Sequence, residues 1–229
     1  MSNIEDFNKK INMPSNFYES KEFKNTFLEC EKSNRSYLLM GKAGTGKSTF
    51  IEYLRNKTKK NVIVLAFTGV AAIRIKGQTI HSFFKLPHRI PKRSDFKILN
   101  NQEFIKTLNT IIIDEISMVR ADLLDAIDIA LKKNRGNKLP FGGLQIIMVG
   151  DIFQLPPIVK NDDEEFIDTK YPDGAWFFNS NAYKLNNVIN LEFNKVYRQK
   201  DEYFINKLQD VRENKVTHEV LSYFNKRVS

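Results

Sequence analysis

The chain has 229 residues and a formal net charge of +9; 41% of its residues are apolar and 18 are Phe. This length suffices for one α/β domain with a large aromatic core, and the single cysteine, Cys30, excludes an internal disulfide and is typical of a reducing compartment. We expect neither a signal peptide nor a membrane span, and the three histidines and Cys30 are too scattered for a zinc site.

In chain order, residues 1–14 are polar and are predicted to be loose, and residues 15–229 are predicted to form one domain. Apolar runs separated by helical patterns predict a central parallel sheet covered by helices on both faces. The predicted strands are 36–40, 62–66, 111–113, 145–149 and 188–191. The predicted helices are 17–32, one starting near 49, 69–73, 117–133, 201–212 and 217–226. Residues 88–93 and 134–143 are predicted loops, and the acidic run 162–165 is interpreted as a solvated loop.

The positive charge favours an anionic partner, either a nucleic acid or an acidic membrane surface. The alternative is a lysine-rich proteome, which the frequent Asn, Lys and Ile residues support in part. Charge alone therefore favours nucleic acid only modestly.

The segment after the first predicted strand carries the strongest motif. Residues 41–48 fit the pattern G-x-x-x-x-G-K-[ST] at every fixed position, between a strand and a helix. Glycines let the backbone wrap around phosphate oxygens, and the helix N-terminus points N–H groups at them. The alternative is an ordinary glycine turn. It is the weaker interpretation, because the motif is complete and lies between a predicted strand and a predicted helix. The predicted nucleotide-binding residues are Gly41, Lys42, Ala43, Gly44, Thr45, Gly46, Lys47, Ser48 and Thr49.

Two further motifs follow buried strands. Asp114 and Glu115 end the strand 111–113, where a carboxylate can hold Mg²⁺ with Ser48 and another can orient the attacking water. Gln154 follows the strand 145–149 in a loop stiffened by two prolines, where an amide can report the γ-phosphate. A solvated strand end and a structural turn are the alternatives, and each would be favoured if its motif stood alone.

Together these motifs resemble those of superfamily 1 helicases. Segments 41–49, 111–118 and 149–157 look like motifs I, II and III, and 196–199 looks like motif IV. Segments 65–72 and 78–84 are similar to the Pif family of 5′-to-3′ DNA helicases, relatives of RecD and of the phage helicase Dda. Segments 122–125 and 140–145 resemble an insert of the Pif branch.

The resemblance implies a RecA-like P-loop NTPase domain that uses ATP and Mg²⁺ in a DNA helicase. It implies catalytic roles for Lys47, Asp114, Glu115, Gln154 and Arg198, and metal binding by Ser48 and Asp114. The DNA-binding residues that it implies are Thr68, Gly69, His81, Ser82 and Phe83. For His81 and Phe83, core packing is an equally good interpretation, and the basic loop 89–93 is either a DNA-attracting segment or a solvated turn.

The resemblance also implies single-stranded DNA and duplex junctions as partners, no membrane, a monomer, and roles in repair, recombination and telomere maintenance. We expect an intracellular protein, cytoplasmic in a bacterium and nuclear or mitochondrial in a eukaryote. Motifs of a second RecA-like lobe and an adenine-reading glutamine in residues 13–20 are not recognisable. We therefore expect a lobe that binds nucleotide weakly and hydrolyses it poorly. A self-contained P-loop ATPase, such as a helicase loader, and a non-catalytic nucleic-acid-binding module remain alternatives.

Overall fold

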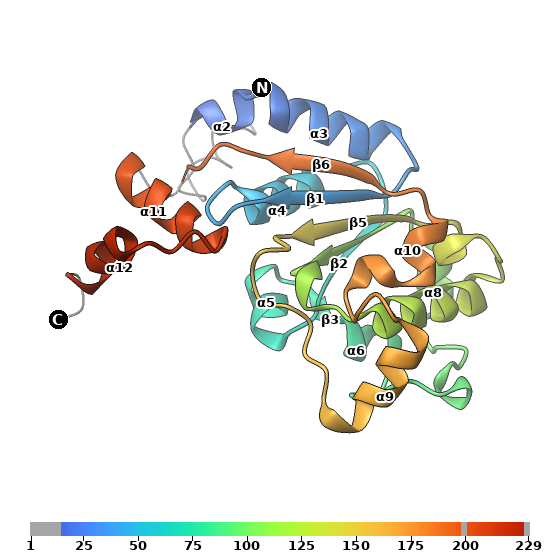
Figure 1. Cartoon of the computed structure of the whole chain (residues 1–229). Helices are drawn as coiled ribbons and strands as arrows, with labels where there is room; N and C mark the ends of the chain where they lie inside the picture. Colours follow the sequence, from blue (N-terminus) through green and yellow to red (C-terminus); the bar gives the residue numbers. More distant parts are fainter. Residues whose placement is uncertain (1–14, 198–200, 227–229) are drawn as a thin grey trace.

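The computed structural model describes residues 15–197 and 201–226, and its centre is a six-stranded sheet (Figure 1). The strand order is β3-β2-β4-β5-β1-β6, and every neighbouring pair is parallel. The strands are β1 (Tyr37–Gly41), β2 (Val62–Ala66), β3 (Gln78–Thr79), β4 (Thr110–Asp114), β5 (Gln145–Gly150) and β6 (Ile189–Phe193). The predicted α/β fold class with a parallel sheet is confirmed.

Helices cover both faces of the sheet. One face is packed by α2 (Ser15–Glu19), α3 (Lys21–Lys32) and α4 (Lys47–Lys57). The opposite face is packed by α6 (Ile80–Phe84), α7 (Gln102–Thr107), α8 (Ala121–Arg135) and α10 (Asn181–Leu185). The remaining α-helices are α5 (Gly69–Arg74), α9 (Asn161–Lys170), α11 (Glu202–Arg212) and α12 (His218–Asn225). Short 3-10 turns are η1 (Arg93–Asp95), η2 (Ile116–Met118), η3 (Pro140–Gly143) and η4 (Phe177–Asn179).

Strand β1 shows how the sequence divides between the two faces. Tyr37 and Leu39 are fully buried in the core with α2, α3 and α4, whereas Leu38 between them belongs to the opposite core. Successive side chains of a strand point to opposite faces, so a strand covered on both sides must be apolar at every position. This is why the central strands read as uninterrupted apolar runs.

The carboxyl ends of the central strands meet at one edge of the sheet. Met40 of β1 lies beside Gly150 of β5, and Ala66 of β2 lies beside Asp114 of β4. The loops after these strands therefore emerge close together, where ligands bind in open parallel sheets. Helices α11 and α12 lie beyond this same edge (Figure 1).

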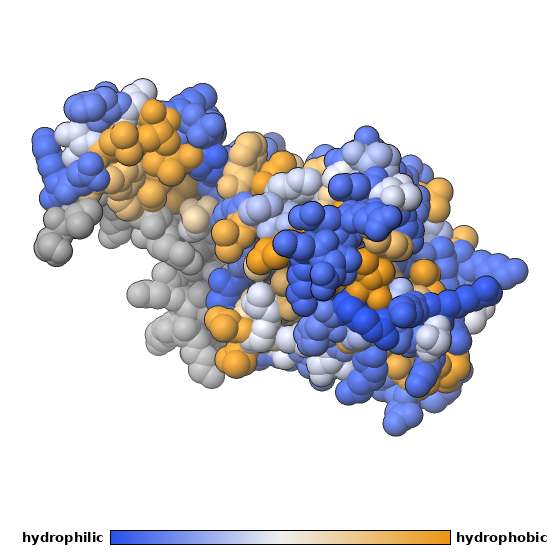
Figure 2. Space-filling view, turned by 60° about the horizontal axis from the view of Figure 1, so that its bottom comes forward, coloured by the Kyte–Doolittle hydropathy of each residue, from blue (hydrophilic) through white to orange (hydrophobic). Residues whose placement is uncertain are grey.

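The helix pair α11–α12 exposes apolar side chains. Figure 2 shows apolar surface gathered on this pair, at the left of the view. The side chains concerned are 39–51% exposed, namely Leu208, Val211, Val216 and Leu221. None of the helices in the described ranges has the length and apolarity that a membrane crossing requires.

Four predicted elements differ from the structure beyond small shifts of their ends. The predicted loop 134–143 contains the last residues of α8 and the turn η3. The predicted helix 17–32 is two helices, because the Ser20 side chain accepts a hydrogen bond from the Phe23 N–H and so caps a new helix start. The predicted helix 117–133 begins only after the turn η2, as α8. The interpretation of 162–165 as a loop was wrong: these residues begin α9, whose N-terminal dipole favours the acidic side chains. The predicted loose segment 1–14 lies outside the described residues.

Candidate nucleotide site

The loop between β1 and α4 has the shape of a phosphate-binding turn. Gly44 and Gly46 have φ values of 79° and 93°, which glycine adopts without steric cost. Gly46 is the N-cap of α4 and has no side chain with which to occupy the first N–H groups of the helix. A Cβ on Gly41 would lie 2.6 Å from Thr45 Oγ1, so only glycine fits there. The loop therefore presents backbone donors and positive helix dipole to an anion.

Lys47 lies back across this loop. Its Nζ donates to the backbone oxygens of Gly41, at 2.5 Å, and Lys42, at 3.0 Å. Burial lowers the pKa of the Lys47 ammonium, and the nearby carboxylates, Asp151 foremost, oppose that shift. An ammonium with carbonyl partners that a phosphate can replace suits the phosphate-binding lysine that the motif predicts.

The acidic pair at the end of β4, Asp114 and Glu115, is held by an arginine. Asp114 is 2% exposed, and burial together with the Glu115 charge raises the pKa of its carboxyl group. Arg74, the last residue of α5, donates from one nitrogen, Nη2, to Asp114 Oδ2 at 3.0 Å and to Glu115 Oε1 at 2.9 Å. Glu115 has a φ of 53°, a left-handed conformation that costs a non-glycine residue about 1 kcal/mol.

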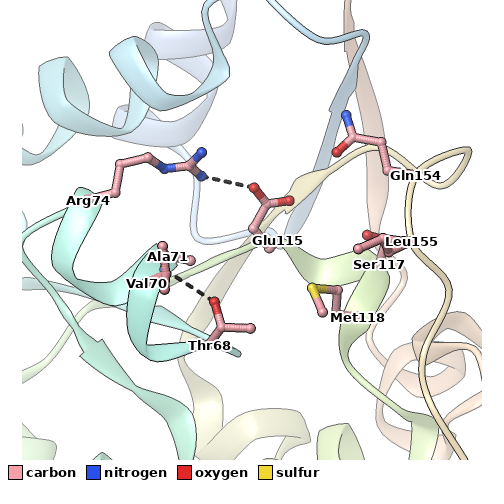
Figure 3. Close-up of a pocket in the computed structure, with 9 residues that line it drawn as sticks. All are labelled: Thr68, Val70, Ala71, Arg74, Glu115, Ser117, Met118, Gln154 and Leu155. Carbon is pink, nitrogen blue, oxygen red and sulfur yellow. Dashed lines mark hydrogen bonds and ion pairs between the residues drawn. The ribbon is translucent and has the colours of Figure 1, made fainter.

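Gln154 approaches the acidic pair from β5. Its side chain, exposed to solvent, lines a cavity of about 210 Å³ together with Glu115, Arg74 and Thr68 (Figure 3). In that view Gln154 and Arg74 lie on opposite sides of Glu115. The structure therefore places the two predicted residues Glu115 and Gln154 on one small cavity, with space between them for a reacting group.

Asp151 connects the β5 loop to α11. It is 2% exposed and accepts two hydrogen bonds from Arg212, from Nη2 at 2.8 Å and Nε at 3.1 Å. The Arg212 guanidinium also lies 4.2 Å from the centre of the Phe153 ring. Burial alone raises the pKa of Asp151, but the hydrogen bonds from Arg212 and from the Phe153 N–H outweigh it and leave the pKa below its usual value.

The donor set fits Mg²⁺. The Ser48 hydroxyl is exposed at the start of α4, and the Asp114 carboxylate lies at the same sheet edge. Hydroxyl and carboxylate oxygens are hard ligands, and Mg²⁺ is commonly bound through one or two of them plus substrate phosphates. Across 15–197 and 201–226 no cluster of three or more His, Cys, Asp or Glu could hold a metal ion without such help.

The residues predicted to bind DNA are placed differently from one another. Gly69 and Ser82 are exposed, and Thr68 caps α5 by accepting from the Ala71 N–H at 3.2 Å. Phe83 is 3% exposed within the core beneath the sheet, which is the packing alternative considered for it. His81 is partly buried, and its ring stacks on that of His88 with centroids 4.2 Å apart.

The predicted residue Arg198 lies outside the described residues. The residue before it contacts the phosphate loop, because the Tyr197 N–H donates to Gly44 O at 2.9 Å. In the basic loop 89–93, the Arg89 side chain is half exposed and forms an ion pair with Asp95 at 2.7 Å.

Two arginines that hold carboxylates at this edge, Arg74 and Arg212, were not predicted from the sequence. Arg74 gave no signal in the sequence, because it reaches the acidic pair only through the pairing of β2 with β4 in the sheet. Arg212 gave no signal either, because its partner Asp151 is 61 residues away in the chain.

Comparisons with known proteins bear on this geometry. A family model described as PIF1-like helicase matches residues 20–221. The ATP-dependent DNA helicase PIF1 of Candida albicans is 37% identical over 194 residues, which cover 80% of this chain and 21% of that protein. The crystal structure of a Bacteroides Pif1 helicase with ADP-AlF3 and single-stranded DNA matches with a TM-score of 0.82 and 39% identity, over 89% of this chain and 48% of that one.

A further solved structure concerns DNA unwinding at forked duplex DNA by two coordinating Pif1 helicases. It matches with a TM-score of 0.83 and 38% identity, over 89% of this chain and 50% of that one. The chain therefore spans about half the length of these solved helicases and about a fifth of the Candida protein.

Proposed function

The chain belongs to the PIF1-like helicase family, and from this premise we propose that it is the ATP-binding, RecA-like lobe of a helicase that moves 5′-to-3′ on single-stranded DNA and opens duplexes. The observation that carries the proposal is the common edge of β1, β4 and β5. The phosphate loop ends β1, the acidic pair ends β4, and Gln154 follows β5. Relatives named ATP-dependent DNA helicases support the reaction class.

In this proposal each residue of the edge has a distinct role in ATP hydrolysis. The loop amides and Lys47 would hold the β- and γ-phosphates, and Ser48 and Asp114 would hold Mg²⁺, which would neutralise phosphate charge. Glu115 would orient the attacking water and accept its proton, while the Gln154 amide would contact the γ-phosphate. Arg198 would supply a planar guanidinium to the charge that develops in the transition state.

A second lobe completes the motor in this proposal, because a translocating helicase needs two lobes whose closure depends on the bound nucleotide. The length of the solved relatives, about twice that of this chain, supports it. So does the apolar surface on α11–α12, since exposed apolar patches mark protein contacts. The 229-residue chain on its own binds nucleotide weakly and hydrolyses it poorly.

The proposed partners are single-stranded DNA and duplex forks, in line with the DNA named for the two solved relatives. Thr68, Gly69 and Ser82 contribute phosphate contacts, and His81 directly precedes Ser82 in the sequence. The protein acts as an intracellular monomer in DNA repair, recombination and telomere maintenance, which are the roles that the family resemblance implies.

The test combines nucleotide binding with hydrolysis. A titration of the chain with a fluorescent, nonhydrolysable ATP analogue is expected to show Mg²⁺-dependent binding, together with slow ATP hydrolysis and no processive unwinding of a forked duplex. Fast hydrolysis accompanied by self-association in sedimentation with ATP would instead identify a self-contained ATPase. DNA binding without any nucleotide binding would identify a non-catalytic module.

A further inference from the structure

Arg74 is the side chain that couples α5 to the acidic pair. Its Nη2 is 3.0 Å from Asp114 Oδ2 and 2.9 Å from Glu115 Oε1, so one nitrogen bridges two carboxylates. Figure 3 shows the bond to Glu115. The Arg74 side chain is 50% exposed, whereas that of Asp114 is 3% exposed. The bridge therefore has a solvated end and a buried end.

Both oxygens of Asp114 already have donors. Oδ1 accepts from the Glu115 N–H at 3.0 Å, and Oδ2 accepts from Arg74. The Oδ1 donor is neutral backbone, but the Oδ2 donor is a full positive charge. A guanidinium and a divalent cation on the same carboxylate repel each other strongly in a partly buried site. Arg74 and a metal ion therefore compete for Asp114.

The backbone that carries Arg74 is fixed. Arg55 of α4 donates from Nη1 to Ile75 O at 3.1 Å and to Lys76 O at 2.9 Å, which ties the end of α5 to the phosphate-loop helix. A Cβ on Gly77 would lie 2.3 Å from Val64 O, so this turn packs directly on β2. With the backbone held in this way, Arg74 can leave Asp114 only by rotation of its side chain.

We propose that Arg74 is a positioning residue: it holds Asp114 and Glu115 together against α5, and Mg²⁺ displaces it from Asp114 while it keeps Glu115. The inference rests on the proposed metal role of Asp114. Helix α5 would then link two sites directly. Its last residue, Arg74, responds to the metal, and its first turn carries Thr68 and Gly69, the proposed DNA contacts.

The test compares Arg74→Gln and Arg74→Lys with the unaltered chain. Arg35→Gln is the matched control, since it removes the same charge from an exposed arginine near the start of β1, at the other end of the strands. Circular dichroism first establishes that each variant is folded. Thermal melting is then followed against MgCl₂ alone, and the Mg²⁺ dependence of binding is measured with a fluorescent ADP.

Arg74→Gln is expected to lower the half-saturating Mg²⁺ concentration about fivefold or more, the usual lower range of a coupling between sites. Its melting temperature is expected to rise with Mg²⁺ more than that of the unaltered chain, because metal then replaces the lost positive charge. Arg74→Lys is expected to fall between the two, since it keeps the positive charge but places it on a shorter side chain with a more strongly hydrated ammonium. Arg35→Gln is expected to match the unaltered chain.

An unchanged or higher Mg²⁺ requirement in Arg74→Gln would overturn the proposal. If Arg74→Gln does not fold, Arg74→Lys decides: a lower Mg²⁺ requirement than in the unaltered chain supports the inference, and an equal or higher one refutes it. Absence of ADP binding in every protein would count against the proposed function instead. The melting series with MgCl₂ alone would still test Arg74.

Discussion

The nucleotide edge and the segment from Thr68 to Phe83 were both assigned to function by motif, but they are built differently. The nucleotide edge is the end of the sheet that carries the loop 41–48, the acidic pair Asp114 and Glu115, and Gln154. At the nucleotide edge, the chemistry belongs to backbone groups and to side chains that follow strand ends. In the 68–83 segment, Gly69 and Ser82 are exposed whereas Phe83 is a core residue. The motif at the nucleotide edge depends on local backbone geometry, so the sequence predicts its site more completely. In the 68–83 motif some side chains pack in the core, and the sequence alone does not separate these from exposed ones.

Helix α6 explains the difference in physical terms. Ile80, Phe83 and Phe84 are at most 3% exposed, and their spacing of three and four residues puts them on one helix face. His81 and Ser82 lie off that face. Helical periodicity therefore separates three core residues from the exposed Ser82 and the partly buried His81.

The largest expected effect distinguishes packing from DNA contact at Phe83. Phe83→Ala is expected to lower the free energy of unfolding by about 3–5 kcal/mol, because it empties a buried aromatic site. Urea unfolding measures this, and Ser82→Ala next to it is expected to change stability by less than about 0.5 kcal/mol. A Phe83→Ala chain of normal stability that had lost DNA affinity would show that the ring contacts DNA rather than the core.

Lys47→Ala tests the nucleotide edge, where we expect a loss of ligand affinity with little loss of stability. Nucleotide affinity is expected to fall about a hundredfold, since a charge-assisted hydrogen bond contributes about 1.5–3 kcal/mol. The free energy of unfolding is expected to stay within about 1 kcal/mol, because Lys47 contacts only two loop carbonyls. Lys57→Ala, which removes the same charge from the last turn of α4, serves as the control in the titration. Equal ATP affinities of Lys47→Ala and the unaltered chain would contradict the phosphate-loop assignment.

Arg212→Ala tests how the nucleotide edge holds α11. The variant leaves Asp151 buried without its cation, and we expect a loss of about 2 kcal/mol, less than for a fully buried pair because the Arg212 side chain is 20% exposed. Adding Asp151→Asn is expected to recover part of that loss in urea unfolding. Additive losses in the double variant would mean that the ion pair does not fasten α11.

The smallest effect is a pH dependence from His81. Burial, and next His88 and Arg120, lower the pKa of His81 to about 4. The unfolded chain takes up this proton near pH 6.5 and the folded chain only near pH 4, so stability is lost as the pH falls between these values. After discounting for partial exposure, His81→Gln is expected to reduce the stability lost between pH 7 and pH 5 by about 1 kcal/mol. Identical pH profiles would show that His81 titrates freely, as a residue open to DNA would.

Much of the fold follows from the sequence alone. The strand 62–66 has its predicted bounds in the structure, because its run of β-branched and aliphatic residues suits a strand in a parallel sheet that is covered on both faces. Helix α9 was missed because its acidic first turn suggests a solvated loop, and the ion pair between Asp163 and Arg120 joins residues far apart in the chain. The same limit hid Arg74, whose role depends on β2 lying beside β4.

A crystal structure of the chain with ADP, aluminium fluoride and Mg²⁺ tests the central claim most directly. The account predicts that the phosphates lie against the N–H groups of residues 43–48, with Lys47, Ser48, Asp114, Glu115 and Gln154 around the fluoride and the metal. Nucleotide bound elsewhere on the surface, or phosphates beside a loop from which Lys47 and Asp114 point away, would contradict it.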